Sequence, residues 1–206
     1  DRTYPMSREE AMEVILNNMP GDTIYSATTG RATRELFFLR EKRSETKAHD
    51  FLNVGSMGHA SSVALGIALE KPERKVVALD GDSACMMHMG AMTMVSKLDV
   101  PNFMHVVLNN GSHESVGGQP SAGHKVDFTK IAEACDYATV GHPVTTEVEL
   151  MEALEVLRNC GKASFIDCRI HKGLSRKLPP VIFDHREVID ALIDNLNESR
   201  ITMDKK

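Results

Sequence analysis

Short apolar runs alternate along the chain with longer segments in which apolar residues recur every three or four positions. Continuous apolar runs are typical of strands buried in parallel sheets, whereas the longer spacing is typical of amphipathic helices. The runs predict strands at residues 22–28, 76–79, 103–108, 138–140 and 164–169. Because strands and helices alternate throughout, we expect an α/β fold, a three-layer doubly wound parallel sheet with helices on both faces.

Capping patterns indicate where several helices begin. Ser7 with Glu10, and Thr146 with Glu149, form capping boxes in which side chain and backbone bond reciprocally in the first turn. Helices are predicted at residues 8–19, 33–42, 59–69, 84–97, 127–135, 146–157 and 184–196. The polar stretches 44–53, 109–125 and 171–184 are predicted loops. We find no internal repeat and no second fold unit, so residues 1–206 are expected to form one domain.

The composition argues against several function classes. The net charge is −5, the pI is about 6.0 and no extended Lys/Arg block occurs, which argues against a main role in nucleic-acid or anionic-membrane binding. No apolar run approaches the ~20 residues of a membrane helix, and no signal peptide is recognised. The four cysteines form neither a CxxC pair nor a zinc-binding spacing. These observations predict a cytoplasmic protein with reduced thiols.

Polar residues follow two buried strands at the points where these strands end. Asp80-Gly81-Asp82-Ser83 ends one strand, and Asn109-Asn110-Gly111 ends the next. Because a helix separates the two strands, they are expected to be parallel, with both carboxyl ends at one sheet edge, where α/β proteins bind ligands. Asp82 would offer a carboxylate and Asn110 an amide oxygen, which are ligands that a hard cation such as Mg²⁺ accepts.

The same edge suits a diphosphate as well as a metal ion. A single carboxylate leaves the cation with net positive charge, and Gly81 lets the backbone approach a ligand closely. The helix that begins near Ala84 would point its free N–H groups at the same place. Polar turns also follow strands without any ligand, which is the alternative interpretation. Two such turns on neighbouring strands favour the ligand site.

The two turns resemble the signature of thiamin-diphosphate (ThDP) enzymes, in which Gly-Asp-Gly is followed one strand later by Asn-Asn. Here Ser83 stands where that signature has its second glycine, and its hydroxyl could add a contact to a phosphate. The resemblance implies that Asp82 and the Asn110 side chain bind Mg²⁺, with the Ser112 carbonyl as the third protein ligand. It also implies that Gly81, Ser83 and Ala84 lie against the diphosphate.

A second segment, Gly55-Ser56-Met57-Gly58, resembles the stretch that holds the aminopyrimidine ring in these enzymes. By this resemblance the Gly55 carbonyl accepts from the 4′-amino group, and Met57 is the apolar wedge that bends the cofactor. Core packing is the alternative role for Met57. The turn at Thr29 and Gly30 is expected to contact the diphosphate.

Three longer stretches resemble the phosphonopyruvate decarboxylases and, less closely, the small subunit of sulfopyruvate decarboxylases. They are residues 28–37, 54–61 and 109–120. The resemblance implies loss of CO₂ from 3-phosphonopyruvate, which gives phosphonoacetaldehyde. Sulfopyruvate or another 2-oxo acid is the alternative substrate.

The histidines in these stretches are candidates for substrate contact or proton delivery. A histidine side chain can carry a proton and hydrogen-bond a phosphonate, so His59 and His113 are both candidates, although either could instead be a structural hydrogen-bonding residue. Glu114 could repel an anionic substrate, and Gln119 and Lys125 could help to close the loop. The remaining candidates are Arg31 and Arg34, which could reach a phosphonate, but a solvated helix face is the favoured interpretation for both.

ThDP enzymes also need a glutamate from a separate pyrimidine-binding domain, and we find no such domain in this sequence. Two explanations are left open: the sequence is the C-terminal part of a longer enzyme, or it is a natural small subunit. In either case we expect a homo- or hetero-oligomer with the site between chains. Nicotinamide and P-loop enzymes are disfavoured because GxGxxG and GxxxxGK[ST] are lacking. A non-catalytic assembly domain is the remaining alternative, should Ser83 prevent cofactor binding.

Overall fold

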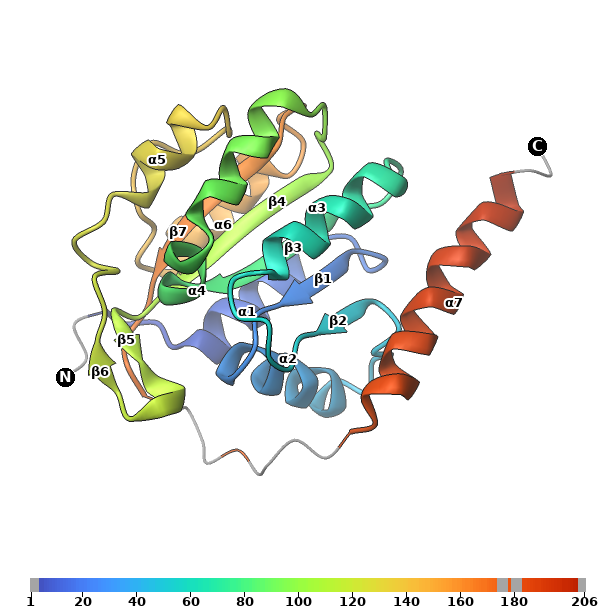
Figure 1. Cartoon of the computed structure of the whole chain (residues 1–206), viewed down its shortest axis with the longest axis horizontal. Helices are drawn as coiled ribbons and strands as arrows, with labels where there is room; N and C mark the ends of the chain where they lie inside the picture. The colour runs from blue at the N-terminus through green and yellow to red at the C-terminus, as the bar shows by residue number, and fades with distance from the viewer. Residues whose placement is uncertain (1–3, 174–177, 179–182, 204–206) are drawn as a thin grey trace.

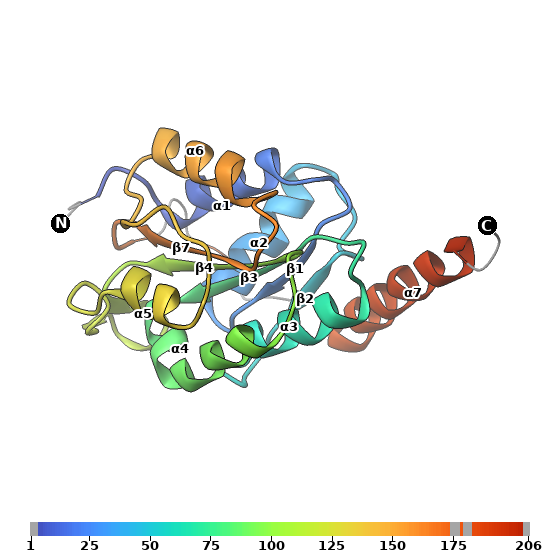
Figure 2. The same ribbon diagram turned by 90° about the horizontal axis from the view of Figure 1, so that it is seen from above.

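The computed structural model describes residues 4–173, 178 and 183–203. A five-stranded parallel sheet in the order β2-β1-β3-β4-β7 forms its centre (Figure 1). The strands are β1 (Ile24–Ala27), β2 (Asp50–Leu52), β3 (Val76–Gly81), β4 (Phe103–Asn109) and β7 (Ser164–Arg169). Helices cover both faces of this sheet (Figure 2), so the predicted three-layer α/β fold is confirmed.

The strand order creates a switch point between β1 and β3. From β1 the chain runs outward to the edge strand β2, and it then returns to build β3, β4 and β7 on the other side. The connections that follow β1 and β3 therefore lead to opposite faces of the sheet. Open α/β sheets bind ligands in the crevice between two such connections.

Two apolar cores fill the space between the sheet and its helices. One face holds α1 (Arg8–Asn18), α2 (Arg31–Lys42) and α6 (Glu147–Leu157), and the other holds α3 (Ala60–Glu70), α4 (Asp82–Met87), the 3-10 helix η1 (Met89–Lys97) and α5 (Phe128–Ala134). Side chains of a strand alternate between faces. Accordingly, Val77 and Leu79 of β3 belong to the first core, and Val76 and Ala78 belong to the second.

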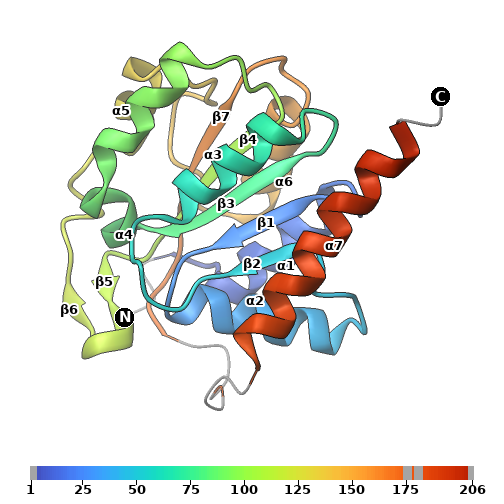
Figure 3. The same ribbon diagram turned by 45° about the vertical axis from the view of Figure 1, so that its right-hand side comes forward.

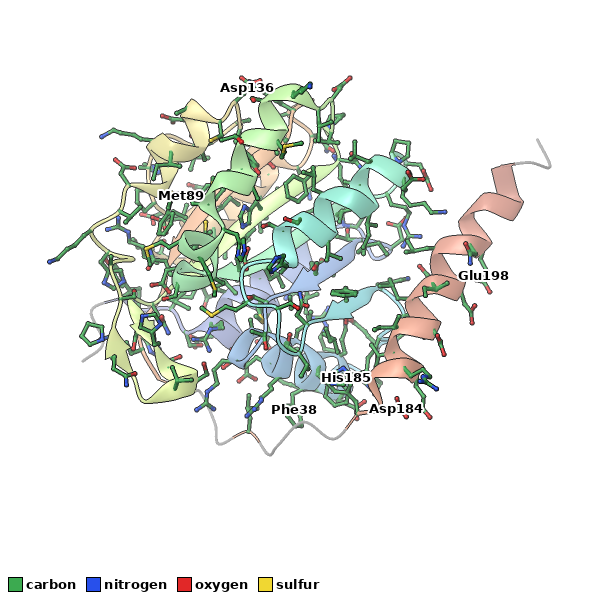
Figure 4. All side chains as sticks on the ribbon, in the orientation of Figure 1. Phe38, Met89, Asp136, Asp184, His185 and Glu198 are labelled. Carbon is green, nitrogen blue, oxygen red and sulfur yellow. The ribbon has the colours of Figure 1, made fainter. Side chains whose placement is uncertain are left out.

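The C-terminal helix α7 (His185–Met203) lies along the edge strand β2 (Figure 3). Aromatic rings fix its beginning, since Phe183 stacks on Phe37 at 5.0 Å between centroids and meets the ring of His185 at 4.6 Å. Figure 4 shows His185 at the first turn of this helix. Lys71 donates to the carbonyl of Leu196 further along. The helix is therefore attached at the sheet edge opposite β7.

The predicted helix caps are present. The hydroxyl of Ser7 accepts from the Glu10 N–H at 3.2 Å, and Glu10 accepts from the Ser7 N–H at 2.7 Å. Thr146 and Glu149 make the same reciprocal pair at the start of α6. Local sequence thus determines where these helices begin.

Residues 44–53 were predicted to be a loop, and this is wrong, because β2 occupies Asp50–Leu52. The stretch resembles a loop because it is polar, and Asp50 contributes to that polarity. The Asp50 carboxylate is fully buried and accepts two hydrogen bonds from Arg40 of α2, each 2.9 Å long. A charge that is neutralised inside the protein does not mark a loop.

Two further predicted elements differ in the structure. The strand expected at 138–140 is only an isolated bridge from Ala138 to Ser164, since Asp136 and Gly141 have positive φ on either side. The helix expected at 84–97 is divided at His88, whose backbone is non-helical, into α4 and η1. The loop expected at 109–125 contains a short hairpin of β5 (Ser112–His113) and β6 (Gln119–Pro120), joined by the 3-10 helix η2 (Glu114–Val116).

Part of the predicted loop at 171–184, including its Pro179-Pro180 pair, lies outside the described residues. Among the residues that are described, no helix is both long and apolar enough to span a membrane. Cys85, Cys135 and Cys168 are buried free thiols, and Cys160 is an exposed one.

Candidate functional site

A pocket of about 140 Å³ opens at the carboxyl ends of β1, β3 and β4, and residues of β5 and η2 line part of it. Nine of the residues proposed from the sequence line it: Thr29, Met57, Gly81, Asp82, Ser83, Ala84, Asn110, Ser112 and His113. Gly30, Gly55, Ser56 and His59 lie outside this lining. The switch point of the sheet therefore brings together most residues that the two strand-end turns suggested.

Asp82 and Asn110 are both buried where the two central strands end, with 2% and 3% of their surface exposed. The hydroxyl of Ser121 donates to Asp82 Oδ2. Asn110 Oδ1 accepts from the backbone N–H of Ser112 at 3.0 Å. Both oxygen-bearing side chains are therefore held in place by the segment that follows β4, rather than rotating freely in solvent.

That segment is closed at its base by backbone and amide contacts. Asn109 Nδ2 donates to the carbonyl of Gly123 at 2.9 Å, and the N–H of Ser121 donates to the carbonyl of Gly111 at 2.9 Å. A Cβ at Gly123 would lie 2.3 Å from Asp82 Oδ2, so no side chain fits there. The chain thus leaves Asn110, forms the hairpin and returns to press against Asp82.

The Gly55–Gly58 turn is tied to the end of β1. The N–H of Gly55 donates to the hydroxyl of Thr29 at 2.9 Å. Gly55, Ser56 and Gly58 have φ of 88°, 43° and 85°, a region that glycine enters readily. At Gly58 a Cβ would also lie 2.9 Å from the carbonyl oxygen of Ala84. The turn brings Met57 to the pocket, while Gly55 and Ser56 are exposed at its rim.

Four pocket-lining residues have a buried polar atom without a hydrogen-bond partner in the described structure: Thr28 Oγ1, Arg31 Nε, Asp80 Oδ1 and Ser83 Oγ. Buried polar groups in folded proteins are nearly always paired. The two hydroxyls, on Thr28 and Ser83, are donors for an oxyanion, which is the chemistry of a diphosphate. The serine that replaces glycine at position 83 thus adds a donor to the site.

A buried ionic cluster connects the hairpin to α1 and α2. Arg8 donates to Glu35 at 3.1 Å and also to Glu114. Burial opposes the charge of Arg8, but Glu35 and Glu114 outweigh it and raise the pKa of Arg8 above its ordinary value. At Glu35 burial raises the pKa of the carboxyl group, although the positive charge of Arg8 opposes this shift. The expectation that Glu114 could repel an anion does not fit this cluster, because its charge is paired with Arg8 and it also accepts from the N–H of Gly173.

The two candidate histidines have different surroundings. His113 lies on β5 and lines the pocket. His59 is exposed outside the lining, its Nδ1 lies 3.2 Å from the Ser56 carbonyl, and its ring centroid is 4.1 Å from that of His88. The other loop residues named from the sequence, Gln119 and Lys125, are also exposed outside the lining.

Several site residues were missed by reasoning from the sequence. From the sequence, Asp80 is only one residue of a turn, whereas in the structure its Oδ2 lies 3.0 Å from Nε2 of the buried His105. From the sequence, Arg8 is only a residue of the first helix, whereas in the structure it lines the pocket. Ser121 carried no signal, because its contact with Asp82 arises only when the hairpin folds back. The unpaired polar atom of Thr28 could have been suspected from its place at the end of β1.

Comparison with known proteins is consistent with this arrangement. Residues 28–168 match the family of the thiamine pyrophosphate enzyme C-terminal TPP binding domain. A phosphonopyruvate decarboxylase from Streptomyces viridochromogenes is 38% identical over 148 residues, which cover 72% of this chain and 36% of that protein. The beta subunit of sulfopyruvate decarboxylase from Methanocaldococcus jannaschii is 27% identical over 190 residues, covering 89% of this chain and 95% of the subunit.

A solved structure of a putative thiamin diphosphate-dependent enzyme from Mycobacterium smegmatis has the same fold, with a TM-score of 0.68 and 23% identity over 83% of this chain and 33% of that one. The chain spans about a third of the phosphonopyruvate decarboxylases that it matches. The match over residues 28–168 includes β3 and β4 and the turns that follow β1, β3 and β4. This chain therefore belongs to the thiamine pyrophosphate enzyme family, through the C-terminal TPP-binding domain of that family.

Proposed function

We propose that this chain supplies the Mg²⁺ and diphosphate half of a decarboxylase site that converts 3-phosphonopyruvate into phosphonoacetaldehyde and CO₂. The observation that carries the proposal is the hairpin segment 109–121, whose first half lines the pocket and whose end returns onto Asp82. The same segment contains the sequence that resembles phosphonopyruvate decarboxylases. Two such enzymes are 37–38% identical to this chain.

The residues of the pocket would hold the cofactor as follows. Asp82, the Asn110 side chain and the Ser112 carbonyl would bind Mg²⁺, which accepts oxygen ligands and keeps positions for phosphate. Gly81, Ser83 and Ala84, with the turn at Thr29 and Gly30, would surround the diphosphate. The unpaired donors at Thr28 and Ser83 support this assignment.

The Gly55–Gly58 turn would hold the other end of the cofactor. The Gly55 carbonyl would accept from the aminopyrimidine, beside Ser56, and Met57 would press on the bend of the molecule. Bound thiamin diphosphate would supply the nucleophilic carbon and the electron sink that a 2-oxo acid needs to lose CO₂. His113 is the better candidate for delivering a proton because it lines the pocket, whereas His59 is assigned to the rim.

A pyrimidine-binding domain is needed to complete the site. Sites that enclose small molecules usually measure about 300–1,000 Å³, so a pocket of about 140 Å³ suits one part of a cofactor. We propose that the second part comes from the same full-length polypeptide or from a separate subunit, in a homo- or hetero-oligomer. The free thiols support a cytoplasmic location, where disulfides are rare.

Sulfopyruvate is the second candidate substrate. One observation favours it: the Methanocaldococcus beta subunit of sulfopyruvate decarboxylase is 27% identical over 190 residues, which include the strand-end turns that line the pocket. A sulfonate and a phosphonate are both tetrahedral oxyanions, so the same kinds of hydrogen-bond donor suit either.

Calorimetric titration with ThDP and Mg²⁺ tests the cofactor assignment. We expect metal-dependent binding that Asp82→Asn abolishes, whereas Asp127→Asn, at an exposed helix cap, leaves it unchanged. The substrate assignment requires the chain to be combined with its pyrimidine-binding half. Phosphonopyruvate, sulfopyruvate and pyruvate are then assayed side by side. Absence of cofactor binding in the assembled protein would favour a non-catalytic assembly domain.

A further inference from the structure

Most charged side chains that line the pocket contact another side chain of the described structure. Arg8 and Glu114 neutralise each other. Asp80 contacts His105, and Asp82 accepts from Ser121. Arg31 lines the same pocket, and its side chain makes no hydrogen bond or ion pair with the described residues. A cation is therefore available at this surface for a ligand.

The position of Arg31 explains why water alone is a poor partner for it. Its Nε atom is buried, and burial of a charged donor without an acceptor is unfavourable. Arg31 is the first residue of α2 and follows Gly30, whose φ is 97°. The backbone thus turns sharply at the end of β1 and directs the start of α2 to the pocket.

Arg31 lines the pocket from the start of α2, and the turn that precedes it lies close to the hairpin. A Cβ at Gly30 would lie 3.5 Å from Oγ of Ser115, so the turn before Arg31 contacts the segment that carries His113. Asp82 and Asn110, in contrast, follow the neighbouring strands β3 and β4. Arg31 therefore follows a turn that contacts the hairpin, at a strand end distinct from those of the metal residues.

Arg34 provides an internal comparison one turn further along α2. It does not line the pocket, and no unpaired buried atom is found on it in the described structure. The sequence suggested a solvated helix face for both arginines. The structure separates them, because Arg31 alone of the two faces the site.

We propose that Arg31 binds the acidic group on C3 of the substrate, a phosphonate or sulfonate, and so selects doubly anionic 2-oxo acids over pyruvate. The inference rests on the proposed decarboxylase function. A guanidinium matches two oxygens of a tetrahedral oxyanion with two parallel N–H groups. Pyruvate has a methyl group at that position and offers no acceptor.

The test uses the assembled enzyme with Arg31→Gln, Arg31→Lys and the matched control Arg34→Gln. A charge-assisted hydrogen bond corresponds to a roughly tenfold to hundredfold change in affinity. We expect Arg31→Gln to raise KM for phosphonopyruvate or sulfopyruvate by that factor, with KM for pyruvate and the ThDP Kd unchanged. Arg31→Lys should retain part of the preference, and Arg34→Gln all of it.

Two outcomes overturn the proposal. If Arg31→Gln weakens ThDP binding by the same factor, the Arg31 guanidinium binds the diphosphate of the cofactor. If Arg31→Gln raises KM equally for pyruvate, Arg31 does not bind the acidic group on C3.

A binding measurement separates this inference from the proposed function. Phosphonoacetate has the phosphonate but no keto group, so calorimetric titration of the cofactor-loaded assembly needs no turnover. Wild-type protein that decarboxylates none of the three acids would refute the proposed function. The role proposed for Arg31 would still be supported if wild-type protein binds phosphonoacetate and Arg31→Gln removes that binding. It would be refuted if wild-type protein does not bind phosphonoacetate, or if the variant binds it equally well. Thermal unfolding of each variant checks that the fold is intact.

Discussion

The guanidinium of Arg8, in the first turn of the first helix, donates to the carboxylate of Glu114, which lies 106 residues later in the hairpin beside the pocket. Glu35 of α2 shares the same guanidinium. One buried cation thus joins two helices to the segment that carries His113. The hairpin has only two residues in each strand, so this cluster is an important anchor for it.

Replacing Arg8 with Met should destabilise the chain by about 3–5 kcal/mol, because it leaves two buried carboxylates without their counter-ion. Lys42→Met is the matched control, since Lys42 pairs with Glu13 at the surface and such pairs contribute about 1 kcal/mol or less. Urea unfolding of the three proteins measures the difference. Equal losses in both variants would show that the buried cluster contributes little.

Gly58→Ala should lower the free energy of unfolding by about 1–3 kcal/mol, as expected for a side chain forced into positive φ. The added Cβ would also meet the Ala84 carbonyl at 2.9 Å and the His88 ring at 2.5 Å. Gly66→Ala, in the middle of α3 with open space around it, should be neutral or stabilising by about 0.5–1 kcal/mol. Thermal unfolding distinguishes the two substitutions, and ThDP titration should show weaker binding for the first alone.

Ser121→Ala should weaken Mg²⁺ binding in the presence of ThDP by about 10–100-fold, the usual effect of removing a residue that orients a metal ligand. The hydroxyl of Ser121 holds Asp82 Oδ2, whereas the exposed Ser96 bonds only to the Thr93 carbonyl in its own helix. Ser96→Ala should leave the affinity unchanged. Calorimetry with Mg²⁺ provides the comparison, and an unaltered Kd for Ser121→Ala would exclude this positioning role.

His113→Gln in the assembled enzyme should reduce kcat by about a hundredfold, within the range usual for loss of a general acid or base. His59→Gln should change kcat by less than about threefold, because His59 lies outside the pocket lining. Steady-state rates with the preferred 2-oxo acid test both values. Equal effects of the two substitutions would contradict the separate roles assigned to these residues.

Protonation of His49 should lower the free energy of unfolding in mild acid. Burial, followed by the positive charges of Arg74 and Arg40, lowers the pKa of His49 below its usual value. The unfolded chain then binds the proton more readily, so the contribution of neutral His49 is present above about pH 6.5 and is lost as pH falls through the lowered folded pKa. His49→Gln should reduce the difference in urea midpoint between about pH 7 and pH 5. A variant with the wild-type difference would argue against the shift.

The sequence allowed prediction where local physics determines the outcome. The capping pairs at Ser7 and Thr146 fixed helix starts, and the ends of two apolar runs indicated Asp82 and Asn110 together. Prediction from the sequence failed where a contact with a residue far away in the chain determines the environment of a side chain. Asp50 appeared to belong to a polar loop because Arg40 could not be placed beside it, and Glu114 appeared repulsive because Arg8 could not. Ser121 was missed because only the folded hairpin brings it to Asp82.

The closed base of segment 109–123 has an evolutionary consequence. Its two ends are fixed to each other and to Asp82 by Asn109, Ser121 and the close packing of Gly123. Residues 113–119 project from this clamp, and apart from Glu114, which Arg8 holds, their chemistry can change without breaking the contacts that hold Asp82. A lineage with this architecture can therefore diversify the compounds it accepts while it inherits its cofactor chemistry intact.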